Sequence, residues 1–164
     1  MRERLHSHLQ ARAVTHAIYQ TVIVLAIVVS LERHPPSDGT LIVYVIGGAI
    51  AVGLADLYAG VVGRMIRERQ PATRRAVRDD AVSILEGILV AIAVPIFFFS
   101  LHRLGVLATQ RAFDLTEWTE LVLIGFYAFV ANRFAGFSVR HSLLLGGATT
   151  LIGLLLVGLK AFFH

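Results

Sequence analysis

Long runs of apolar residues dominate the chain, and short groups of charged, Pro or Gly residues separate them. A helix needs about 20 mainly apolar residues to cross a bilayer core roughly 30 Å thick. Five segments approach or reach that length. The pattern therefore predicts an all-α, polytopic membrane helix bundle that forms a single transmembrane domain. The predicted spans cover residues 13–31, 41–63, 81–101, 117–134 and 142–163.

Local sequence features bear on the start of the fourth span and on the end of the third. The stretch Asp114-Leu-Thr-Glu117 resembles a capping box, and acidic side chains suit the positive end of a helix dipole, so the fourth span is expected to begin there. The segment Leu101–Phe113 is compatible with a helix on the lipid surface or with a continuation of the third span.

The distribution of basic residues predicts the orientation. If the N-terminus is cytoplasmic, 11 of the 15 Lys and Arg residues fall in cytoplasmic segments, many of them in the connection 64–80. This asymmetry follows the positive-inside rule and favours an odd number of crossings. We therefore expect a multi-pass protein of the bacterial inner (cell) membrane.

Composition agrees with this prediction and limits the kinds of binding partner to expect. Hydrophobic residues make up 56% of the chain and charged residues only 16%, whereas soluble domains carry about a quarter charged residues. The basic residues lie beside hydrophobic spans, so no nucleic-acid partner is expected. The arginines of the 64–80 connection set the topology, and they are candidates for binding anionic lipid headgroups. They are Arg64, Arg67, Arg69, Arg74, Arg75 and Arg78.

Polar residues inside the spans are the candidates for chemistry, because a charge at mid-membrane costs about 2.5–3.5 kcal/mol on insertion scales. Asp56 lies eight residues before Arg64, and Glu86 lies eight residues after Arg78. At 1.5 Å per residue, both lie about 12 Å inside the cytoplasmic boundary. Other spans carry polar groups near the same depth, and together these residues predict a path for protons or cations. They are His16, Tyr19, Gln20, Asn132 and Arg133.

Structural roles are alternatives for five of these residues. Tyr19 and Gln20 are compatible with interhelical hydrogen bonds. Ser83 and Glu86 fit a capping box, which would place Glu86 at the start of a span. Asp56 is equally compatible with a structural ion pair to Arg133. His16 is compatible with a simple hydrogen bond to a backbone carbonyl.

Small residues recur at helical spacing in two spans and predict close helix packing, within the chain or between subunits. In the second span they are Gly47, Ala51, Ala55, Ala59 and Gly63; in the fifth they are Gly146, Thr149 and Gly153.

Catalytic signatures are missing from the sequence. It contains no cysteine, phosphate-binding loop, paired-histidine motif or nucleophile with a plausible base. We therefore expect no enzymatic activity, no cofactor and no metal site. The leading hypothesis is a homo-oligomeric channel or transporter for protons or cations. The alternative is an accessory or scaffold protein that packs against a membrane-protein partner through its small-residue faces.

Three stretches resemble a family of small, uncharacterised bacterial integral membrane proteins. They are Ala17-Ile-Tyr-Gln-Thr-Val-Ile-Val-Leu-Ala26, Leu54-Ala-Asp-Leu-Tyr-Ala-Gly60 and Val157-Gly-Leu-Lys-Ala-Phe-Phe-His164. The resemblance spans nearly the whole chain and implies about five transmembrane helices. It implies no activity. The Asp56 position is more often histidine in that family, which implies a titratable or hydrogen-bonding role there.

Overall fold

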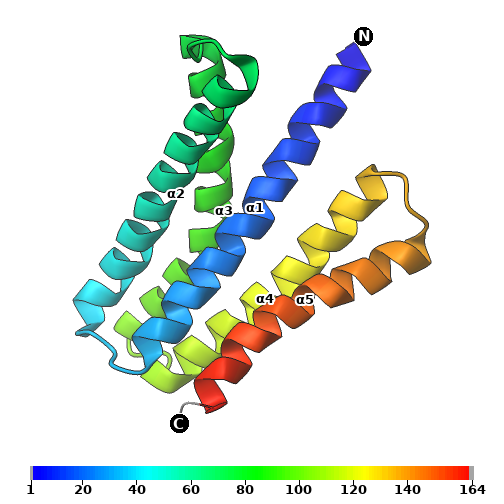
Figure 1. The fold of residues 1–164 in the computed structure, drawn as a ribbon. Helices are drawn as coiled ribbons and strands as arrows, with labels where there is room; N and C mark the ends of the chain where they lie inside the picture. Colours follow the sequence, from blue (N-terminus) through cyan, green and yellow to red (C-terminus); the bar gives the residue numbers. More distant parts are fainter. Residues whose placement is uncertain (1, 163–164) are drawn as a thin grey trace.

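Five α-helices run alternately in opposite directions along one bundle (Figure 1). The computed structural model describes the backbone of residues 2–162 and the side chains of residues 14–37 and 39–158, and these residues contain no strand. The predicted end of the last span, at residue 163, lies outside the described residues. The helices are α1 (Arg2–Glu32), α2 (Asp38–Glu68), α3 (Arg74–Arg103), α4 (Thr109–Phe134) and α5 (Val139–Phe162).

The connections between helices are short turns that alternate between the two ends of the bundle (Figure 1). Connections 69–73 and 135–138 lie at the end that we call the basic end, because the arginines of 64–78 gather there. Connections 33–37 and 104–108 lie at the opposite end. Gly105 and Gly136 adopt positive φ angles of 74° and 85°, a conformation that glycine tolerates without a Cβ clash.

The helices extend beyond the apolar runs. Most of the predicted 64–80 connection is helical, because α2 continues to Glu68 and α3 begins at Arg74. Similarly, the segment Leu101–Phe113 holds the end of α3, a turn at 104–108 and the first residues of α4. Arg, Glu and Gln are good helix formers, so helical structure does not stop where hydropathy falls.

Helix α1 occupies the centre of the bundle. It contacts α2, α3, α4 and α5. Within the part of the chain that the structure describes, α2 contacts only α1 and α3, and α5 contacts only α1 and α4. The remaining contacts join α3 to α4. A polar side chain on α1 is therefore well placed to contact side chains of several other helices.

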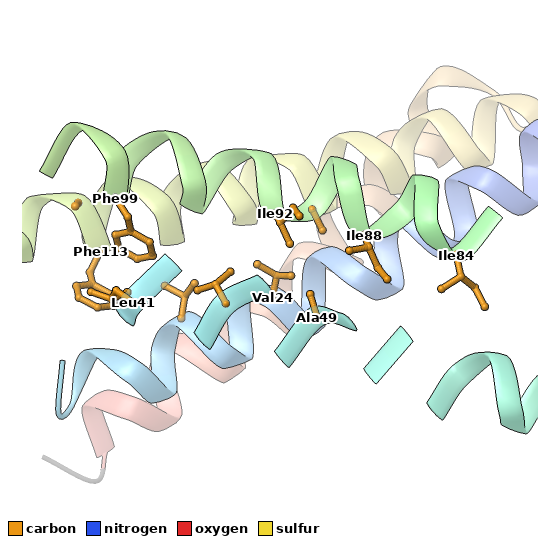
Figure 2. Packing of buried hydrophobic residues seen from close by; sticks show 12 residues of the cluster. Val24, Leu41, Ala49, Ile84, Ile88, Ile92, Phe99 and Phe113 are labelled. Carbon is orange, nitrogen blue, oxygen red and sulfur yellow. The ribbon is translucent and has the colours of Figure 1, made fainter. Parts of the chain in front are cut away.

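Two hydrophobic clusters hold the helices together. The larger runs along α3 between α1 and α2, from Ile84 to an edge-to-face contact between Phe99 and Phe113, whose ring centroids lie 5.0 Å apart (Figure 2). The smaller joins Leu25 of α1 to Leu121 and Ile124 of α4. The aromatic end of the larger cluster fills the bundle near its opposite end, where α3 ends and α4 begins.

The outer surface is strongly apolar. Tyr58 is 73% exposed, Leu144 72% and Val122 68%, and many other large apolar side chains are similarly exposed. Four helices, α1, α2, α3 and α5, contain segments long and apolar enough to cross a membrane. The fold is that expected of an integral membrane protein. Helix α4 has 26 residues, enough to span, but is not among these four.

Glycines allow α4 and α5 to approach closely. A Cβ on Gly146 would lie 2.9 Å from the carbonyl oxygen of Gly125, and a Cβ on Gly153 would lie 2.6 Å from Cδ2 of Leu121. Two residues of the small-residue face predicted for the fifth span, Gly146 and Gly153, thus pack within the chain, whereas the Thr149 hydroxyl donates to the Leu145 carbonyl of its own helix at 2.9 Å. In α2 the predicted stripe faces outward instead. Its residues Gly47, Ala51, Ala55 and Ala59 are exposed, and Gly63 is half-buried.

We predict that Gly146→Leu destabilises the bundle while Gly147→Leu does not. A side chain at 146 must displace the backbone of α4, whereas a Cβ at 147 meets nothing within 4 Å. Overpacking typically costs about 1–3 kcal/mol. Thermal and denaturant unfolding in the same detergent, followed by circular dichroism, measures the difference. Equal stabilities for the two variants would contradict the described α4–α5 contact.

Candidate functional site

An acid–histidine pair joins α1 and α2 in the basic half of the bundle. Nδ1 of His16 lies 3.4 Å from Oδ2 of Asp56, and the two side chains are 27% and 28% exposed. The Asp56 Oδ2 atom is shielded from solvent. Two of the predicted path residues therefore meet each other, and the His16 side chain does more than satisfy a backbone carbonyl.

Arg133 is not the partner of Asp56. Helix α2 makes no contact with α4 in the described chain, and Arg133 instead donates a 2.6 Å hydrogen bond to the carbonyl of Phe137 at the exposed end of α4. Its neighbour Asn132 donates to the Ala128 carbonyl at 2.7 Å. The predicted ion pair between Asp56 and Arg133 is therefore wrong, and the structure separates Asn132 and Arg133 from the acid–histidine pair.

Glu86 lines a cavity that His16 also lines. The cavity has a volume of about 400 Å³. Glu86 does not cap a helix, because α3 begins twelve residues earlier at Arg74 and the Thr73 hydroxyl accepts the capping hydrogen bond from the Ala76 backbone N–H at 3.3 Å. The capping interpretation of Glu86 is therefore wrong. The cavity is lined by His16, Arg78, Asp79, Asp80, Val82, Ser83 and Glu86.

The backbones of α1 and α3 come very close beside this cavity. A Cβ on Gly87 would lie 3.0 Å from the His16 carbonyl carbon. Glycine at 87 thus brings α3 against α1 at the level of His16, and it brings Glu86 and His16 to the same cavity. His16 contacts Asp56 on one side and the cavity on the other.

A salt bridge ties α2 to α3 at the basic end. Nη2 of Arg64 lies 2.5 Å from Oδ2 of Asp80, with both side chains about one-fifth exposed. Arg64 is therefore held by an acid of the protein. The other arginines proposed to meet lipid headgroups are exposed at this end: Arg67, Arg69, Arg74, Arg75 and Arg78.

The last two predicted path residues differ in environment. Tyr19 is 43% exposed on the outside of α1, whereas Gln20 is completely buried inside the bundle. Gln20 lies four residues after His16, so the two side chains project from the same side of α1, one turn apart. The structure thus places His16 and Glu86 at one cavity, pairs Asp56 with His16, and places Gln20 one turn deeper.

Two buried acids on α4 were not among the predicted path residues. Glu117 is 5% exposed and Glu120 is completely buried. Glu117 was interpreted as part of a helix cap, but α4 begins eight residues earlier at Thr109. The available signal was periodicity, because Glu117 and Glu120 share one helix face with Phe113 and Ile124.

Metal and cofactor binding were not expected from the sequence. Among the described side chains, no group of three or more histidines and acids is placed to hold a metal ion. The arrangement is instead a polar cavity with exposed lining residues such as Glu86, a part-buried acid–histidine pair, and a deeper set of fully buried polar side chains. Such an arrangement is suited to moving or holding a small cation.

Comparison of the chain with protein-family models, with curated proteins and with solved structures finds no match. The family resemblance of the three sequence stretches therefore stays a prediction.

Proposed function

We propose that this protein is a membrane channel or transporter for protons or small cations, without a catalytic activity. The observation that carries the proposal is the His16–Asp56 pair beside the cavity that contains Glu86. Ionisable groups inside membrane bundles are costly and are typically retained for ion or proton transfer. Imidazole can pass a proton between neighbouring groups, and His16 contacts both Asp56 and the cavity.

We also propose that the chain crosses a bacterial cell membrane five times, with the N-terminus and the basic end in the cytoplasm. The charge asymmetry supports this orientation. It makes the cavity the cytoplasmic entrance of the path. The exposed arginines at that end would lie at the level of anionic lipid headgroups.

We predict that Asp56→Asn lowers proton or cation flux on the order of tenfold, equivalent to about 1.4 kcal/mol in barrier height. The substitution keeps the size of the side chain but removes the charge that faces His16. Purified protein in liposomes is assayed for proton flux with a pH-sensitive dye and for Na⁺ and K⁺ flux with ion-sensitive dyes.

Glu68→Gln is the matched control, since Glu68 is an exposed acid at the end of α2 and its neutralisation should leave the flux unchanged. Wild-type flux no greater than that of empty liposomes, across pH and membrane potential, would overturn the proposed function.

A second candidate function is that of a scaffold, and the outward stripe on α2 favours it. Ala51, Ala55 and Ala59 are exposed, and the neighbouring Gly47 and Gly60 have nothing within 4 Å of an added Cβ. Small residues permit close approach of another membrane helix. This face would bind a helix of another membrane protein, or of a second copy in a homo-oligomer.

The scaffold candidate predicts that Ala55→Leu removes a stoichiometric partner from complexes purified out of native membranes, whereas Asp56→Asn does not. Ala148→Leu on the exposed side of α5 is the matched control and should have no effect. Mass spectrometry identifies the partner and its stoichiometry. Purification of the wild-type chain alone would reject a hetero-partner, and a second copy would indicate a homo-oligomer.

A further inference from the structure

Helices α1 and α4 carry three buried polar side chains that have no hydrogen-bond partner. Both carboxyl oxygens of Glu120 are unpaired, as are both polar atoms of the Gln20 amide and the Thr21 hydroxyl. All three side chains are completely buried. Buried polar groups are normally hydrogen-bonded, so a cluster of unpaired groups indicates that something else satisfies them.

The three side chains lie in one layer of the bundle. The side chains of Glu32 and Gln110 form a hydrogen bond, which aligns the end of α1 with the start of α4. From that contact, Glu120 lies ten residues along α4, and Thr21 and Gln20 lie 11 and 12 residues back along α1. At 1.5 Å per residue these positions are about 15 to 18 Å from the contact, within one helical turn of each other.

Packing around this layer directs Thr21 and Glu120 toward the α1–α4 contact. Leu25, one turn after Thr21, packs against Ile124, one turn after Glu120. Gln20 also lies one turn from His16 on the side of α1 that faces the cavity. From the basic end toward the middle of the bundle, the order is thus the cavity, His16, Gln20 and Glu120.

We propose that Glu120, together with Gln20 and Thr21, binds a single monovalent cation, H⁺ or Na⁺, in the middle of the bundle. One positive charge neutralises the Glu120 carboxylate, which would otherwise be an unpaired charge in an apolar interior. The other buried acid of α4, Glu117, lies one turn earlier and is not among the unpaired groups. Carboxylate, amide and hydroxyl oxygens are the hard ligands that a small dehydrated cation prefers. This site deepens the proposed transport function and rests on it, because His16 and the cavity connect the site to one side of the membrane.

Dicyclohexylcarbodiimide tests the site directly. This apolar reagent enters bilayers and adds to a protonated carboxyl group, and the adduct rearranges to a stable N-acylurea with no leaving group. We predict that Glu120 of the protein in liposomes is modified, as detected by peptide mass spectrometry. For a proton site, the rate falls as pH rises and does not respond to Na⁺. For a sodium site, Na⁺ protects Glu120 at fixed pH, whereas choline at equal ionic strength does not.

Two variants provide the controls. Glu120→Gln should abolish the modification, and Glu68→Gln, at an exposed acid outside the proposed path, should leave the modification of Glu120 in place. A Glu120 that is not modified, or that is modified at a rate independent of both pH and Na⁺, would overturn the proposed site.

Thermal unfolding in detergent supplies a second readout that needs no transport. Ligand binding to the folded state raises the melting temperature, so Na⁺ or a lower pH should stabilise the wild type more than Glu120→Gln. Equal responses in the two proteins would count against the site.

The outcomes for the site and for transport can be distinguished. Cation binding without flux would refute transport but keep the site, whereas flux that is unchanged by Glu120→Gln would refute the site but keep transport.

Discussion

The burial of two acids of α4, Glu117 and Glu120, inside an apolar bundle is the constraint on which the rest of the structure depends. A bilayer core offers no water to satisfy polar groups, so they must be satisfied inside the protein. Glu117 and Glu120 accordingly face inward, and Glu120 is fully enclosed. The contacts of α4 with α1, α3 and α5 provide this enclosure, and the apolar faces of the other helices remain directed outward.

The central position of α1 connects this buried acid with the basic end. One side of α1 carries His16 and, one turn deeper, Gln20, while the adjacent positions Val24 and Leu25 enter the two hydrophobic clusters. The bundle is therefore asymmetric along its axis. Its basic half holds the cavity and the acid–histidine pair, whereas the opposite half is filled by the Phe99–Phe113 contact and its apolar neighbours (Figure 2). This asymmetry suits a cation path that is open from one side and closed at the other.

Hydropathy was sufficient to predict the helical architecture. It did not predict where each helix ends or which face of a helix points away from the bundle. The extensions of α2 to Glu68 and of α3 back to Arg74 lie outside the apolar runs, where hydropathy carries no signal. The outward direction of the Ala51 and Ala55 stripe could not be predicted either, because α2 is apolar on all sides and only tertiary contacts decide which face is buried. Glu120 was overlooked because acids near the start of an apolar run suit a helix dipole as well as a buried site. Its burial depends on α1 and α3, which are distant in sequence.

Labelling of single cysteines on the two sides of α4 tests the central claim, that this acidic helix crosses the membrane within the bundle. The chain has no cysteine, so Val106→Cys and Phe137→Cys each provide one thiol, at exposed positions of the connections before and after α4. A membrane-impermeant maleimide is applied to intact cells and to opened membranes. We predict that residue 106 reacts in intact cells, and that residue 137 reacts only after the membrane is opened. Reaction of both residues from the same side would contradict the account.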